Sequence, residues 1–171
     1  NRPSNIILVG FMGAGKSACA SHVSSTLDYG IIDTDALIET QQGCSINALF
    51  DVSESHFRNC EFDLLQSLSQ TQNHVISTGG GMIIEPRCQP LLQALGWVVY
   101  LEVSVQTVLD RLADNSTRPL LQRPDKEAAI STLLSKRHPV YDAHSDLCIK
   151  TDTLTIAEIS DIIVSKYRTL S

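Results

Sequence analysis

The chain has 171 residues, 43% of them hydrophobic, which is enough for one domain with a hydrophobic core and short for two. Its formal net charge of −6 argues against a nucleic-acid-binding protein, and no apolar run approaches the roughly 20 residues that a membrane-spanning helix needs. Its five cysteines are scattered without a CxxC pair, which fits neither a disulfide framework nor a zinc site, so we expect a cytoplasmic protein with reduced thiols.

Short apolar runs alternate with longer amphipathic runs along the whole chain. The short runs, which are mostly β-branched, predict strands at 6–9, 30–33, 74–77, 97–102 and 147–150. The longer runs predict helices at 16–27, 34–42, 54–69, 86–95, 105–113, 125–137 and 156–167. This alternation is typical of βαβ units, and continuously apolar strands are typical of a sheet buried on both faces. We therefore expect an α/β fold with three α/β/α layers around a five-stranded parallel sheet, in one domain over 1–171.

The first predicted strand leads into the sequence GFMGAGKS at 10–17, which matches the GxxxxGK[ST] phosphate-loop motif and opens the first helix. Glycines let the backbone curl so that successive N–H groups point at phosphate oxygens, and the helix N-terminus adds its positive dipole end. In such a loop Lys16 reaches the β- and γ-phosphates, and the Ser17 hydroxyl is a ligand of Mg²⁺. The motif predicts nucleotide binding, with Gly13, Ala14 and Gly15 at the phosphates.

The phosphate loop alone does not distinguish GTPases, ATPases and kinases. The sequence has no NKxD-like motif of the kind with which GTPases bind their base. A motor or AAA-type ATPase would be longer and would have a strand ending in a magnesium-binding Asp, whereas the third strand here ends in Ser77-Thr78 and three glycines. Among the classes of phosphate-loop protein, the one that remains at this length is a small-molecule kinase.

Asp33-Thr34-Asp35 stands at the end of the second predicted strand. The carboxyl ends of parallel strands face the ligand crevice, so these acids are expected beside the phosphate loop. One would orient a water of Mg²⁺, and the other would accept a hydrogen bond from the substrate hydroxyl and take its proton. The alternative is that one of them only caps the next helix.

Arg58 lies one helical turn after Glu54 and one turn before Glu61 in the helix predicted at 54–69. This spacing fits a surface ion-pair ladder, worth roughly 0.2–0.5 kcal/mol per pair. It fits equally well an arginine that carboxylates hold in one orientation so that it binds a substrate anion bidentately. On spacing alone both interpretations stay open.

Gly79, Gly80 and Gly81 directly follow the third predicted strand, where they would let the backbone approach a ligand closely. A flexible connector is the alternative. Three glycines at the end of a central strand are costly in conformational entropy, which favours a binding role.

Two arginines follow later in the chain. Arg118 belongs to a polar stretch at 114–124 that contains two prolines and predicts a loop able to close over the site. There it would stabilise charge on the transferred phosphoryl group. Arg137 is predicted to end the helix at 125–137, where a favourable interaction with the helix C-terminus would by itself explain a basic residue.

In chain order, the segments GFMGAGKS, DTD, FRNCE, STGGG, RPLL and KRHPVY resemble the shikimate kinase family of phosphate-loop, nucleoside-monophosphate-kinase-like proteins. The resemblance covers nearly the whole chain. It implies transfer of the γ-phosphate of ATP to the 3-hydroxyl of shikimate, in aromatic amino acid biosynthesis, with Mg²⁺ as cofactor and the two small molecules as the partners of a monomer. It also implies a substrate-binding subdomain at about 34–62 and a lid at about 113–125.

For the acceptor, the resemblance implies that Asp35 binds the shikimate hydroxyls and acts as catalytic base. Arg58 and Arg137 would bind the shikimate carboxylate, with Glu61 orienting the arginines. The glycines at 79–81 would line the ring.

For the nucleotide, the resemblance implies that Lys16 and Arg118 stabilise charge on the phosphates. Ser17 would be the Mg²⁺ ligand, with Asp33 and Ser77 in the next shell around the ion. Arg111 would stack on the adenine.

Three positions depart from the family pattern. Ala18 replaces a hydroxyl residue close to the α-phosphate, Ser53 stands where GExxF is usual, and Leu154 falls where some members carry an Arg near the adenine. They concern nucleotide affinity more than the reaction. A gluconate-kinase-like enzyme and a degenerate member that binds nucleotide without turnover are the alternatives. Retention of the catalytic and binding residues argues against the second.

Overall fold

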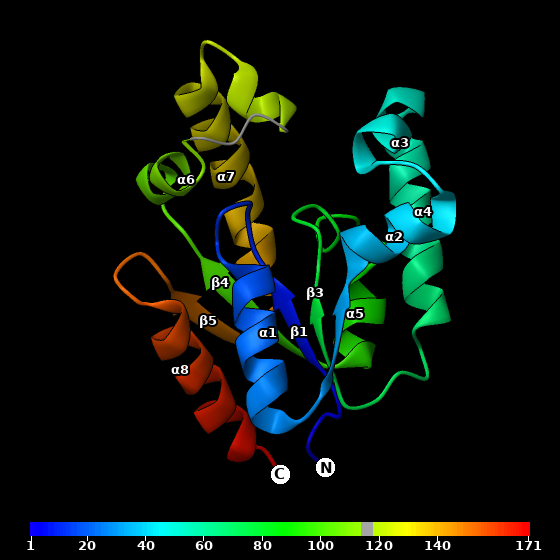
Figure 1. Cartoon of the computed structure of the whole chain (residues 1–171), viewed down its shortest axis with the longest axis vertical. Helices are drawn as coiled ribbons and strands as arrows, with labels where there is room; N and C mark the ends of the chain where they lie inside the picture. The colour runs from blue at the N-terminus through cyan, green and yellow to red at the C-terminus, as the bar shows by residue number, and fades with distance from the viewer. Residues whose placement is uncertain (114–117) are drawn as a thin grey trace.

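The computed structural model describes residues 1–113 and 118–171 of the chain. Five parallel strands form its sheet, in the order β2-β3-β1-β4-β5 (Figure 1). The strands are β1 (Ile6–Val9), β2 (Gly30–Asp33), β3 (His74–Ser77), β4 (Trp97–Glu102) and β5 (Leu147–Lys150). The helices are α1 (Lys16–Leu27), α2 (Thr34–Gln42), α3 (Ile46–Val52), α4 (Glu54–Ser67), α5 (Gln89–Leu95), α6 (Val105–Arg111), the 3-10 helix η1 (Pro119–Gln122), α7 (Lys126–Ala143) and α8 (Ile156–Arg168). The predicted α/β class and the five predicted strands are confirmed.

Strand order explains which strands are buried. The central strand β1 is completely buried, because β3 and β4 flank it and helices cover both of its faces. The expectation that every strand is buried on both faces is wrong for the two edge strands. β2 leaves 48% of Ile31 exposed, and β5 has only Ile149 buried.

The sheet register aligns the strand ends that matter for the site. Asp33 at the end of β2 pairs with Ser77 at the end of β3, and Ser77 pairs with Leu8 of β1, which leads into the phosphate loop. Residues that follow these strands therefore meet at one edge of the sheet, as parallel strands require.

Helices cover the sheet on two sides. α1 packs against α8 on one face, while α5 and α7 pack against β4 on the other (Figure 1). Above the carboxyl ends of the strands, α2, α3 and α4 stand on one side, and η1 with the start of α7 on the other. No helix in 1–113 or 118–171 is both long and apolar enough to cross a membrane.

Several helix bounds differ from the predicted ones, and α7 differs most. It continues through Pro139 to Ala143, so Arg137 lies inside the helix and not at its end. Pro139 removes one backbone hydrogen bond from the helix. Tyr141, two residues later, is completely buried, and this burial holds the last turn of α7 in place. Interaction with the helix C-terminus therefore does not explain Arg137.

Smaller differences concern short elements. α3 and η1 were not predicted, and α5 begins at Gln89 because residues 79–88 form successive turns after the strand. Part of the predicted lid at 113–125, namely 114–117, lies outside the described residues.

Candidate active site

The phosphate loop connects β1 to α1. Gly15 precedes the helix with φ +89°, a left-handed conformation that glycine adopts without strain. No side chain in the described part of the chain caps the first turn of α1, so its N–H groups are available to an anion. The Lys16 ammonium donates to the carbonyl oxygens of Gly10 at 2.6 Å and Phe11 at 3.1 Å. Burial, and then the charge of Arg118, lowers the pKa of Lys16 to about 8.

A set of oxygen atoms lies beside the loop. The Ser17 hydroxyl donates to Asp33 Oδ2 at 3.2 Å, and Ser17 Oγ lies 3.5 Å from the Ser77 hydroxyl. Asp33 also caps α2, because its Oδ1 accepts from the backbone N–H of Ala36 at 3.1 Å. The capping alternative is thus correct for Asp33, which uses one oxygen for the cap and the other for Ser17.

Asp35, one residue into α2, does not act as the cap. Its Oδ1 is buried and has no hydrogen-bond partner among the described residues. Burial, and then the charge of Asp33, raises the pKa of Asp35, while Lys16 and Arg118 act in the opposite direction. A buried acceptor without a donor is costly, so this oxygen is suited to a hydroxyl group brought by a ligand.

Arg58 is bound on α4 by a buried carboxylate. Its NH1 donates to Glu61 Oε1 at 2.5 Å, and Glu61 has no exposed surface. The contact with Glu54 is looser, at 3.6 Å, and the Glu54 side chain is 72% exposed. Burial raises the pKa of Glu61 to about 7, against the opposing effect of Arg58. A surface ion-pair ladder does not describe this pair, because Glu61 and most of Arg58 are removed from solvent.

Two aromatic rings complete the surroundings of Arg58. Its guanidinium carbon lies 5.3 Å from the centroid of Phe57 and 5.7 Å from that of Phe50. Such contacts stabilise a cation and limit the orientations of its planar group. Phe50 was missed because α3 was not predicted.

The triple glycine lies between Asp35 and Arg58. A Cβ at Gly79 would stand 2.6 Å from Asp35 Oδ1, and a Cβ at Gly81 would collide with the Arg58 guanidinium. The turns that follow are anchored by Met82 and Ile83, which are completely buried. This close approach to Asp35 and Arg58 leaves no room for a side chain at Gly79 or Gly81, which favours a binding role over a flexible connector.

Tyr141 links α7 to this loop. Its hydroxyl donates to the Gly80 carbonyl at 2.6 Å, and its ring is completely buried against Tyr100 at 4.9 Å. One turn earlier, Arg137 extends over the Phe11 ring at 5.8 Å. Tyr141 belongs to the quoted KRHPVY segment, but its role was not predicted, because no sequence spacing indicates a partner 61 residues away.

One cavity, of about 940 Å³, brings the predicted residues together. Those that line it are Gly13, Gly15, Lys16, Ser17, Ala18, Asp33, Asp35, Arg58, Glu61, Ser77, Gly79, Gly80, Gly81, Arg118 and Arg137. The lining also includes residues that were not predicted, among them Met12, Asn47, Phe50, Asp51 and Leu120. Four basic side chains face four acidic ones in this lining, so a ligand meets separate positive and negative groups and not a uniform field.

Two predicted residues lie outside the cavity lining. The side chain of Ala14, within the phosphate loop, is completely buried. Arg111 lies at the outer side of the phosphate loop, where it donates to the carbonyls of Gly13 at 2.8 Å and Thr151 at 3.2 Å. Arg111 is thereby fixed next to the backbone of the phosphate loop.

Comparison with known proteins identifies the family. The family model "Shikimate kinase" matches residues 12–168. A shikimate kinase of Xanthomonas euvesicatoria pv. vesicatoria is 41% identical over 165 residues, covering 96% of this chain and 92% of that protein. The structure of a shikimate kinase from Acinetobacter baumannii in complex with shikimate superposes with a TM-score of 0.91 and 32% identity, over 98% of this chain and 96% of that one. A gluconokinase from Sinorhizobium meliloti, at 15% identity and a TM-score of 0.66 over 98% and 93% of the two chains, shares the fold alone.

Proposed function

The chain belongs to the shikimate kinase family, and we propose that it transfers the γ-phosphate of ATP to the 3-hydroxyl of shikimate through the residues described above. One observation carries the assignment of roles. The unpartnered buried oxygen of Asp35 shares a cavity with Arg58, Arg137 and the phosphate-loop Lys16. That combination suits an acceptor with adjacent hydroxyls and one carboxylate.

The acceptor carboxylate is assigned to the two arginines. Arg58 is held by Glu61, so its fork is oriented before the ligand arrives, and Arg137 extends from the facing helix. Guanidinium groups bind carboxylates bidentately, which fixes the acid in one pose. We assign the backbone at 79–81 to the floor beneath the ring, and residues 34–62 to a substrate-binding subdomain.

Asp35 is assigned as the catalytic base. Its raised pKa makes it a better proton acceptor than an ordinary aspartate, while the charges of Lys16 and Arg118 act to lower that pKa. The 3-hydroxyl donates to Asp35, and its oxygen attacks the γ-phosphorus as the bond to the ADP oxygen breaks. The hydroxyl proton passes to Asp35, and ADP leaves.

Lys16 and Arg118 are assigned to the phosphates. Both line the same cavity as Asp35, and positive charge there stabilises the oxygens of the transferred phosphoryl group. We assign residues 113–125 to a lid that carries Arg118 and excludes water during transfer.

The oxygen atoms beside the loop fit a magnesium ion. Ser17, Asp33 and Ser77 offer hydroxyl and carboxylate oxygens only, and Mg²⁺ is commonly bound in kinases by one or two such groups together with phosphates and water. When bound with ATP, the ion neutralises phosphate charge. We assign Ser17 as its ligand and the other two side chains as acceptors for its waters.

The adenine is assigned to the region of Arg111, whose guanidinium is already fixed by two backbone carbonyls. With Ala14 and Ala18, it completes the nucleotide site. We further propose that the chain works in the cytoplasm, and as a monomer, since the residues assigned to the site all come from one chain.

A coupled assay of ADP release tests the function. The protein is mixed with ATP, Mg²⁺ and, one at a time, shikimate, gluconate, AMP and CMP. We expect turnover with shikimate alone. Turnover with gluconate or AMP but not shikimate would overturn the acceptor assignment, and ATP binding without any turnover would indicate a degenerate member of the family.

A further inference from the structure

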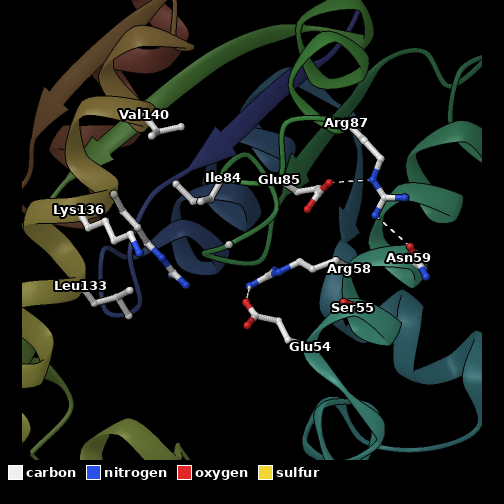
Figure 2. A pocket seen from close by; sticks show the side chains of 12 residues that line it. Glu54, Ser55, Arg58, Asn59, Ile84, Glu85, Arg87, Leu133, Lys136 and Val140 are labelled. Carbon is white, nitrogen blue, oxygen red and sulfur yellow. Dashed lines mark hydrogen bonds and ion pairs between the residues drawn. The ribbon is translucent and has the colours of Figure 1, made fainter.

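A second cavity, of about 500 Å³, lies outside the acceptor site, between α4, the turns after β3 and α7 (Figure 2). Arg58, Gly81, Leu133 and Arg137 line both cavities, so these residues form the wall between them. The volume falls within the range of small-molecule sites. The roles assigned to Arg58, Gly81 and Arg137 concern the active-site cavity, and no role is assigned to Arg87 or Lys136.

The outer cavity is positive in an acidic protein. Four of the chain's 13 Lys and Arg residues line it, against two of its 19 acidic residues. The basic side chains are Arg58, Arg87, Lys136 and Arg137, and the acidic ones are Glu54 and Glu85. The active-site cavity instead has four of each sign. Arg58 and Arg137 line both cavities, so the basic residues that belong to the outer cavity alone are Arg87 and Lys136.

Arg87 is fixed in this cavity before any ligand binds. Its Nε donates to Glu85 at 2.7 Å, its NH2 donates to Asn59 at 3.0 Å, and its guanidinium carbon lies 4.9 Å from the Phe62 ring centroid. An arginine that only keeps the surface soluble would need none of these three contacts. They orient the planar group at low entropic cost, which favours binding of an oxyanion.

Lys136 faces Arg87 from the other wall. Figure 2 shows Lys136 on α7 and Arg87 on opposite sides of the cavity, with Arg58 reaching between them. Within the described part of the chain, neither a hydrogen bond nor an ion pair occupies the Lys136 ammonium. The apolar side chains of Ile84 and Val140 complete the lining.

We propose that the outer cavity binds a small polycarboxylate. Cations on opposite walls require at least two anionic groups on one ligand, and the apolar patch suits a short carbon skeleton. Because Arg58 and Arg137 border both cavities, such a ligand draws these arginines away from the acceptor carboxylate. It therefore weakens binding of the acceptor acid and leaves ATP binding unchanged.

Titration calorimetry with tricarballylate, a three-carboxylate probe, tests this site on the full chain without nucleotide or metal. We expect submillimolar binding that weakens as salt is added. In the Arg87→Gln/Lys136→Gln variant the affinity falls by at least about tenfold, which is the effect expected for the loss of a single charged contact. The matched control is Lys166→Gln, which removes an exposed lysine from α8 and leaves the affinity unchanged.

Two outcomes would overturn the proposal. One is equal binding by the double variant and the unmodified chain, or no binding at all. The other is loss of binding in Lys16→Met, which would assign the probe to the phosphate loop. The readout is binding and not turnover, so it is independent of the kinase assignment. An unchanged melting temperature in the double variant shows that the protein is folded.

A kinetic arm tests the coupling between the two cavities. With free Mg²⁺ held constant, tricarballylate is expected to raise the KM for shikimate severalfold in the unmodified chain and not in the double variant. The KM for ATP should stay the same. An equal rise in both KM values would contradict the shared-wall mechanism.

Discussion

The nucleotide half and the acceptor half of the active site are built in different ways. The phosphate loop is one short segment, and its shape follows from glycine conformations and from the uncapped first turn of α1. The acceptor half takes side chains from α2, α4 and α7, with the turns after β3 between them. The first half depends on local backbone geometry, whereas the second depends on tertiary packing and on a buried ion pair. Substitutions in the acceptor half should therefore separate acceptor binding from ATP binding.

Asp35 lies where the two halves meet, and its replacement has the largest expected effect. Asp35→Asn keeps the shape but removes the proton acceptor, so kcat should fall by about 10³-fold, within the usual range for general-base catalysis. ATP binding, measured by titration with a fluorescent analogue, should remain within about twofold. Activity close to that of the unmodified chain would remove Asp35 from the base role.

Arg58→Ala should damage the acceptor half alone. Losing one charged hydrogen-bonding partner is worth about 1.5–3 kcal/mol, so the KM for shikimate should rise by roughly 100-fold while the KM for ATP stays constant. Steady-state kinetics with each substrate varied in turn measures both values.

Arg58→Ala also leaves Glu61 buried without its partner, which destabilises the fold. The Arg58→Ala/Glu61→Gln double variant controls for this effect. It should regain thermal stability and not acceptor binding. Recovery of the shikimate KM in the double variant would show that misfolding, and not a lost contact, caused the defect.

Glu61 should make the stability of the acceptor half depend on pH. Its pKa rises from 4.5 in an unfolded chain to about 7 in the folded one. Between these values the folded protein holds a proton that the unfolded chain has released, so the free energy of unfolding falls as the pH rises from 4.5 to 7. The change is at most about 3 kcal/mol.

Urea unfolding at a series of pH values checks this prediction. Glu61→Gln removes the titrating group, so its unfolding free energy should vary less over the same interval. Glu54→Gln, which replaces the exposed partner of Arg58, serves as the control and should keep the full pH dependence. Identical pH profiles for Glu61→Gln and the unmodified chain would assign the titration to another group.

The contrast between the local phosphate loop and the packed acceptor half also explains which features can be predicted from the sequence. The strands and the phosphate loop are predicted correctly because apolar β-branched runs and a contiguous glycine motif act locally. The α3 helix was missed although Ser45 caps it, with its hydroxyl accepting from Ala48 at 3.1 Å. Its seven residues are too few to show a clear helical period.

Arg137 shows why features that depend on tertiary packing could not be predicted from the sequence. A proline two residues later suggested that the helix ends there, and proline inside a helix costs about 3 kcal/mol. Burial of Tyr141, one turn after Arg137, compensates for this cost. That burial depends on tertiary contacts, which no local sequence pattern encodes. The choice between a surface ladder and a buried pair at Arg58 likewise required the position of α4 in the fold.

The smallest expected effect concerns the link between α7 and the glycine loop. Tyr141→Phe removes the hydrogen bond to the Gly80 carbonyl, so the backbone of the glycine loop and the turn of α7 that carries Arg137 are no longer tied together. We expect the KM for shikimate to rise about three- to tenfold, with kcat and the KM for ATP nearly unchanged, since a net hydrogen bond is worth about 1 kcal/mol.

Tyr167→Phe is the matched control for this substitution. Tyr167 is equally buried and donates to the Pro3 carbonyl at 2.5 Å, but it belongs to α8 and does not line the active-site cavity. Both variants should lose thermal stability, whereas only Tyr141→Phe should change the KM for shikimate. If both raise it equally, Tyr141 stabilises the fold in general, and the geometry of the acceptor half does not depend on this bond.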